Sequence, residues 1–157
     1  MKVKIVCVGK VKEKYFSQAI DEYKKRLGRF CSVEIAEVAE YTEKNQNPSQ
    51  KQIETILQNE AKDVEKKLEG FVVVLDKDGQ KLSSEQFAKT LHDQQQTNST
   101  FTFVLGSSFG LSEQIKQRAN LKFSFGNVTL PHTLARVVLT EQIYRAFMIL
   151  SNSNYHK

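Results

Sequence analysis

The feature of this sequence that most restricts its fold is a short, wholly apolar run at residues 71–75, Phe-Val-Val-Val-Leu. The run has the length of a strand, and Gly70 stands directly before it. A strand that is apolar at every position needs cover on both faces, which is the environment of a central strand in a parallel sheet. The run therefore predicts a parallel sheet with helices packed on both sides.

Strand and helix patterns alternate along the rest of the chain. Further strands are predicted at residues 2–8, 30–38 and 101–105, and shorter extended pieces at 121–125 and 128–130. Apolar residues recur at helical spacing within residues 15–27, 53–68, 83–91, 112–119 and 133–150. This alternation predicts an α/β fold with a mostly parallel sheet flanked by helices, in one domain of residues 1–157.

Polar residues mark the expected helix starts and one turn. Asn47 is expected to cap the second helix, with Gln50 at the N3 position, and Ser83 forms a capping box with Gln86. Residues 76–79, Asp-Lys-Asp-Gly, are expected to form a turn directly after the apolar strand.

Positive charge is concentrated at the two ends of the chain. The formal net charge is +5; residues 1–31 carry nine Lys or Arg against three acids, and residues 101–157 carry six against two. If the two ends meet in the fold, they form a basic face suited to nucleic-acid phosphates. The run Lys24, Lys25 and Arg26 fits such a contact, and it equally fits a solvated helix end.

Several kinds of site find no support in the sequence. The three histidines and two cysteines lack zinc spacing, and the Gly-rich motifs of dinucleotide sites and P-loops are missing. No apolar run approaches the roughly 18 residues of a membrane span. Cys7 and Cys31 fall in apolar strand patterns, so we expect reduced core cysteines in a cytoplasmic protein with no metal and no membrane attachment.

The last predicted helix, residues 133–150, is apolar around most of its circumference. Such a helix must be buried nearly all round. A homodimer interface through this helix would supply the cover, and the alternative is a central helix enclosed by a single chain.

Two loops follow predicted strands and suggest a pocket. Ligands of open α/β sheets bind outside the carboxyl ends of the strands. We therefore expect a pocket formed by Leu75, Gly106 and the backbone of residues 125–130, whose free N–H and C=O groups can contact an adenine edge.

Short motifs spread from the first strand to the last residue carry a family resemblance. They include Val6-x-Val8-Gly9-Lys10 near the start and, after Leu105, Gly106-x-x-x-Gly110-Leu111, Leu130-Pro131-His132, Glu141-Gln142-x-Tyr144-Arg145-Ala146 and the terminal Tyr155-His156-Lys157. Together they resemble the ribosomal RNA large-subunit methyltransferase H family, which belongs to the SPOUT class of S-adenosylmethionine-dependent methyltransferases.

The resemblance implies a fold, a cofactor, a reaction and partners. The C-terminal part of the sheet would be threaded as a deep trefoil knot, and the active unit would be a homodimer. The reaction would be methylation of N3 of a pseudouridine in large-subunit (23S) ribosomal RNA, on the assembled ribosome. The cofactor, S-adenosyl-L-methionine, would be bound by Leu75, Gly106, Phe125, Gly126, Asn127, Val128, Thr129 and Leu130.

One residue departs from the family pattern. The family usually has two adjacent glycines after the fourth strand, and here Ser107 stands at the second position. A positive φ at this position, or a cofactor resting on bare backbone there, would make the serine weaken cofactor binding.

Polar residues of the last helix and the tail are the candidates for chemistry and RNA contact. The catalytic candidates, as proton acceptors or charge stabilisers, are His132, Arg136, Glu141 and His156. The RNA-binding candidates, for phosphates or base stacking, are Arg145, Tyr155 and Lys157. Two plainer interpretations stay open, namely an i, i+4 ion pair of Glu141 with Arg145 and a frayed C-terminus.

Two other functional classes remain alongside the methyltransferase. A non-catalytic RNA- or ribosome-associated module would have lost its cofactor site at Ser107 and would show no saturable cofactor binding. A nucleotide-binding enzyme acting on a small molecule would fit the pocket, but it would leave the basic ends and the tail without a role.

Overall fold

Five parallel strands form the centre of the molecule, in the computed structural model that describes residues 1–42 and 46–155. The sheet order is β2-β1-β4-β3-β5, and every neighbouring pair is parallel. The strands are β1 Lys2–Val8, β2 Ser32–Val38, β3 Phe71–Lys81, β4 Thr100–Leu105 and β5 Leu121–Ser124. The predicted α/β class with a parallel sheet is confirmed.

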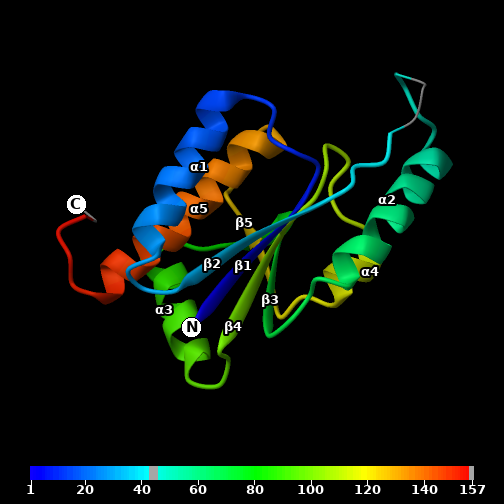
Figure 1. The fold of residues 1–157 in the computed structure, drawn as a ribbon. Helices are drawn as coiled ribbons and strands as arrows, with labels where there is room; N and C mark the ends of the chain where they lie inside the picture. The colour runs from blue at the N-terminus through cyan, green and yellow to red at the C-terminus, as the bar shows by residue number, and fades with distance from the viewer. Residues whose placement is uncertain (43–45, 156–157) are drawn as a thin grey trace.

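Helices cover both faces of this sheet (Figure 1). One layer consists of α1 Lys14–Leu27, α3 Ser84–Gln95 and α5 His132–Leu150, and the other of α2 Gln50–Glu65 and α4 Glu113–Gln117. Each layer encloses its own apolar cluster. Successive side chains of a strand point to opposite faces, so Ile5 and Cys7 of β1 join the first cluster while Val6 and Val8 join the second.

The apolar run at residues 71–75 occupies the interior position predicted for it. It begins β3, which lies between β4 and β5, and Val73 and Val74 have no exposed surface. Burial of a valine side chain contributes about 1.5–3 kcal/mol to stability. Because β3 is covered on both faces, its valines stabilise the packing of both helix layers against the sheet.

The turn predicted at residues 76–79 is wrong. β3 continues to Lys81, but its pairing with β5 shifts register, so that Leu75 and Gln80 both lie opposite Phe123. The polar residues between them leave the ladder as a bulge, and the strand resumes because Lys81 still pairs with Ser124. The expected extended piece at 128–130 likewise forms no strand.

One predicted helix cap is displaced by two residues and another is confirmed. Ser49 caps α2, and its side chain and backbone exchange hydrogen bonds with Gln52. The prediction for Asn47 is wrong. Ser49 lies between Pro48 and the first helical residue, and its hydroxyl can equally accept a hydrogen bond from a free N–H of the first turn. The capping box of Ser83 and Gln86 at α3 is present as predicted.

Both cysteines are free and buried, as predicted. Burial raises the pKa of Cys7 to about 12 and that of Cys31 to about 11, so both thiols stay protonated at neutral pH. None of the helices within the described residues is both long and apolar enough to cross a membrane.

Candidate active site

The carboxyl ends of β4, β3 and β5 lie side by side at one edge of the sheet, since these three strands are neighbours and parallel. A cavity of about 390 Å³ opens there, between the bulged part of β3 and the segment that connects β5 to α5. Its lining residues are Leu75, Asp76, Lys77, Asp78, Phe123, Ser124, Phe125, Gly126, Asn127, Val128, Thr129, Leu130 and Ala135.

Most of the residues predicted to bind the cofactor line this one cavity. Leu75 supplies one side, and residues 125–130 supply the other. Gly106 is not among the described lining residues. A glycine is needed at position 106 for a local reason, because a Cβ there would lie 2.1 Å from the carbonyl oxygen of Gly110.

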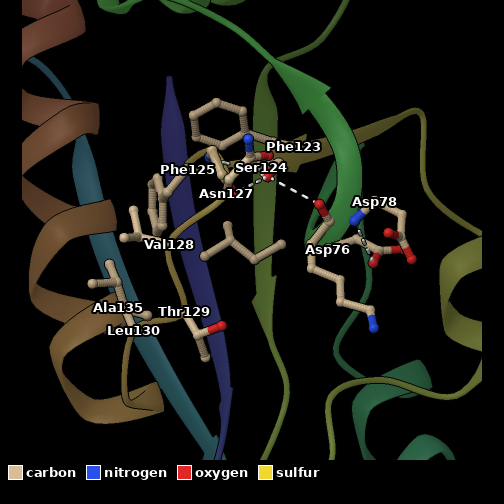
Figure 2. A pocket seen from close by; sticks show the side chains of 13 residues that line it. Asp76, Asp78, Phe123, Ser124, Phe125, Asn127, Val128, Thr129, Leu130 and Ala135 are labelled. Carbon is tan, nitrogen blue, oxygen red and sulfur yellow. Dashed lines mark hydrogen bonds between the residues drawn. The ribbon is translucent and has the colours of Figure 1, made fainter.

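The two sides of the cavity differ in character (Figure 2). Asp76 and Asp78 lie along the β3 side, whereas Phe125, Val128 and Leu130 form an apolar side opposite them. Neither aspartate was predicted as a site residue, because residues 76–79 were expected to form a turn. Their position directly after a central apolar strand was the signal that could have identified them.

Hydrogen bonds hold the segment after β5 against β3. The Ser124 hydroxyl donates to the carbonyl oxygen of Lys77 at 3.2 Å and accepts a hydrogen bond from the Gly126 N–H at 3.1 Å. The Lys81 ammonium donates to the Asn127 side-chain oxygen. Gly126 has φ +106°, a conformation that side chains disfavour, so the glycine is needed for this course of the backbone.

Arg136, a predicted catalytic residue, points into the interior of the fold. Its side chain is almost fully buried and donates to Glu37 Oε1 at 2.6 Å and to the Gly9 carbonyl oxygen at 3.0 Å. Only its Nε atom lacks a partner among the described residues. In this structure Arg136 ties the start of α5 to the ends of β1 and β2.

Glu141, Arg145 and Tyr155 form a separate cluster farther along α5. The Arg145 guanidinium donates to Glu141 at 2.6 Å and lies 4.8 Å from the centre of the Tyr155 ring. The Tyr155 hydroxyl donates to the same carboxylate at 3.2 Å, and its ring packs edge-on against Tyr144. The ion pair of Glu141 with Arg145 is therefore present, and the interpretation of a frayed C-terminus does not hold for Tyr155, which packs against α5.

The remaining candidates divide between the cavity end of α5 and the unplaced tail. His132 is the first residue of α5, directly after the loop that lines the cavity, and it is half-buried. The predictions for His156 and Lys157 lie outside the described residues. No group of metal-binding side chains occurs in the part of the chain that the structure describes.

Comparison with known proteins assigns the family. Residues 1–156 match the family described as "Predicted SPOUT methyltransferase". The chain belongs to the SPOUT methyltransferase family. The family expected from the sequence motifs is thereby confirmed.

Individual relatives of this SPOUT protein cover its whole length. A protein of Streptococcus gordonii is 50% identical over 161 residues, and one of Leuconostoc mesenteroides is 47% identical, each covering 100% of both chains. Both are named ribosomal RNA large subunit methyltransferase H. A probable methylase family protein from Haemophilus influenzae shares the fold, with TM-score 0.56 and 12% identity over 99% of this chain and 70% of its own.

Ser107, the departure from the expected motif of this SPOUT family, has an ordinary backbone. Asn152 is the only described non-glycine residue with positive φ, so position 107 makes no demand for glycine on that ground. The buried Ser107 hydroxyl donates to Glu60 Oε2 at 3.1 Å, and the Tyr41 N–H donates to Oε1 of the same carboxylate at 3.2 Å. A glycine at this position would remove the donor to Glu60 Oε2 and leave the carboxylate with the Tyr41 N–H.

Proposed function

We propose that this protein transfers a methyl group from S-adenosyl-L-methionine to N3 of a pseudouridine in 23S ribosomal RNA, on the assembled ribosome in the cytoplasm. The observation that carries the proposal is the single cavity in which Leu75 and residues 125–130 come together. Full-length relatives named as ribosomal RNA large subunit methyltransferases support the RNA substrate. Residues 1–157 act as one domain in this proposal.

The cavity suits the cofactor in size and in chemistry. Its volume of about 390 Å³ lies in the range of small-molecule sites, which is about 300–1,000 Å³. The apolar side formed by Phe125, Val128 and Leu130 suits an adenine ring, and backbone groups of residues 126–128 can pair with its edge. Lys116 already pairs with Asp76 at 3.3 Å, so Asp78 is the lining carboxylate that places negative charge near a ligand that is itself a cation.

Methyl transfer at this site requires mainly alignment. When bound, the cofactor would supply an activated methyl group, whose bond to sulfur would break as N3 loses its proton and accepts that group. The loop at residues 125–130, fixed by Ser124 and by the Lys81–Asn127 hydrogen bond, holds the methyl donor in one position. Such positioning is a large source of rate acceleration when the nucleophile lies in line.

His132 is the described residue best placed to take the proton. It follows the cavity-lining Leu130 by two residues and is not fully buried. Glu141 is less suited because Arg145, Gln142 and Tyr155 all donate hydrogen bonds to its oxygens. We assign the catalytic proton transfer to His132 and treat Glu141 as the anchor of Arg145 and Tyr155.

A homodimer would unite the two groups of site residues. Along α5, Arg145 lies ten residues beyond Ala135, which is a rise of about 15 Å, so one chain cannot present both at one point. A two-fold axis perpendicular to α5 packs two copies of this helix antiparallel. The Arg145 and Tyr155 end of one copy then lies near the cavity of the other, where it can hold the RNA.

The deciding experiment measures transfer of a labelled methyl group to ribosomes from cells that lack this protein. Free large subunits and naked ribosomal RNA run in parallel, with an enzyme-free control. We expect label in 23S RNA only with assembled ribosomes, and Leu130→Arg, which fills the cavity with a cation, should lose it. A folded protein that labels none of the three substrates and binds no cofactor would instead be the non-catalytic module.

A further inference from the structure

A second hollow lies on the α1 side of α5, away from the cofactor cavity. It has a volume of about 420 Å³ and is lined by Glu22, Lys25, Arg26, Arg29 and Tyr144. α1 and α5 pack side by side, so the basic C-terminal end of α1 meets the C-terminal half of α5 here (Figure 1). The two end segments of the chain therefore meet in the fold, although the cations that line the hollow all come from α1 and the residues directly after it.

The positive charge of this hollow is not neutralised within the protein. Glu22 pairs with Arg26 at 2.7 Å, and this hydrogen bond lowers the pKa of the Glu22 carboxyl. Lys25 and Arg29 are exposed and have no acidic partner among the described residues. Two cations outweigh the roughly half negative charge of a helix C-terminus, so the hollow attracts anions.

Two lysines nearer the start of the chain do not share this property. Lys2 and Lys4 of β1 both form ion pairs with Glu34 and Glu69. Of the four cations in residues 24–29, by contrast, only Arg26 forms an ion pair with a described acid. A solvated helix end would need no hollow, whereas a bound phosphate group would occupy one.

Aromatic rings give the hollow a rigid floor. The Arg26 guanidinium lies 5.7 Å from the ring centre of Tyr23 and 5.9 Å from that of Tyr144. Tyr144 is itself buried and packs against Tyr155 of the tail. Arg26 is therefore held in place by Glu22 and the rings, while Lys25 and Arg29 remain available beside it.

We propose that this hollow binds the phosphate backbone of the substrate RNA through Lys25 and Arg29. This contact, which lies outside the cofactor cavity, helps to position the ribosome on the protein. The inference rests on the proposed function. A polyanion fits better than a single small anion because the two available cations flank the hollow and stand in solvent. Phosphate contacts of this kind orient a nucleic acid without reading its bases.

The test compares two double variants that remove the same charge. Lys25→Gln with Arg29→Gln alters the hollow, and Lys51→Gln with Lys62→Gln removes two exposed, unpaired lysines of α2 on the opposite face of the sheet. Direct binding to ribosomes and to naked 23S RNA is measured over a series of salt concentrations. Methyl transfer is measured separately, so loss of binding and absence of activity can be told apart.

We expect the hollow variant to bind ribosomes and naked RNA about tenfold more weakly than the control variant, with a salt dependence smaller by about 1.4 in log–log slope. KM for ribosomes rises accordingly, while kcat and cofactor binding change less than about twofold. Equal binding and equal slopes for the two variants would overturn the proposal. So would a loss confined to ribosomes with naked RNA unaffected, because the partner would then be a ribosomal protein.

Discussion

Glu60 is a buried carboxyl whose loss of hydration is offset only in part by hydrogen bonds. It is 2% exposed, and no described cation pairs with it. Burial raises its pKa above the ordinary value of 4.5, and the hydrogen bonds from Tyr41 and Ser107 offset this only in part. The folded protein therefore binds this proton more tightly than the unfolded chain, and the free energy of unfolding falls as the pH rises above 4.5.

Glu60→Gln should remove this dependence on pH. The glutamine oxygen can accept the Tyr41 N–H and its amide can donate to Ser107, so both contacts survive without a buried charge. We expect the variant to be more stable than the wild type by about 1 kcal/mol near neutral pH and to lose that advantage toward pH 4.5. Urea unfolding across this range measures it, with the exposed Glu54→Gln as control. Parallel stability curves for wild type and Glu60→Gln would refute the argument.

At the scale of the element, α5 is the helix whose pattern one chain does not satisfy. Its buried residues are Arg136, Leu139, Thr140, Ile143, Tyr144 and Ala146, which form the face toward the sheet, α1 and α3. Leu134, Val137 and Val138 remain partly exposed and belong to neither apolar cluster. A central helix enclosed by a single chain is therefore not what this fold contains, which favours the predicted homodimer.

A charge placed on this open face should separate the predicted dimer. Val138→Glu would bury a carboxylate at the interface, at a cost of about 2 kcal/mol or more, which is roughly a 30-fold weaker association. Phe109→Glu is the matched control, because Phe109 is an exposed apolar residue beside α2 on the opposite layer. Sedimentation equilibrium distinguishes them. A Val138→Glu protein that associates as the wild type does would place the interface elsewhere.

At the scale of the whole molecule, cofactor binding should stabilise the fold because the cavity joins β3, β5 and the start of α5. A ligand at about 100 times its Kd adds about 2.7 kcal/mol to the free energy of unfolding. For a chain of this size that is a rise in Tm of roughly 5–11 °C. Thermal unfolding with and without S-adenosyl-L-methionine provides the measurement.

A pair of variants at the rim of the cavity makes this expectation specific. Val128 is 73% exposed, so replacing it should change the stability of the free protein little. Val128→Lys adds a cation beside a cationic ligand and should reduce the rise in Tm, whereas Val128→Met should retain it. An unchanged Tm in wild-type protein at high cofactor concentration would count against the cofactor site.

The larger elements could be predicted from the sequence because their patterns are local. Residues 71–75 are apolar at every position and follow Gly70, and this strand-length run indicated an interior strand that is covered on both faces. The box of Ser83 and Gln86 was equally predictable, because both hydrogen bonds join residues three apart. The trefoil knot rests on the family resemblance and stays a prediction, because strand pairing alone does not describe how the chain is threaded.

What only the tertiary structure decided are contacts between distant segments. No local pattern indicates that Arg136 donates to Gly9 and Glu37, or that Ser107 needs Glu60, because each pair spans dozens of residues. The bulge after Leu75 likewise depends on β5, which pairs with β3 on both sides of it. Sequence alone thus determined most strands, most helices and the composition of the loop that lines the cavity, since these follow from periodicity and short motifs. Packing determined which polar side chains face the cavity, which are buried as anchors, and where the unpaired positive charge gathers.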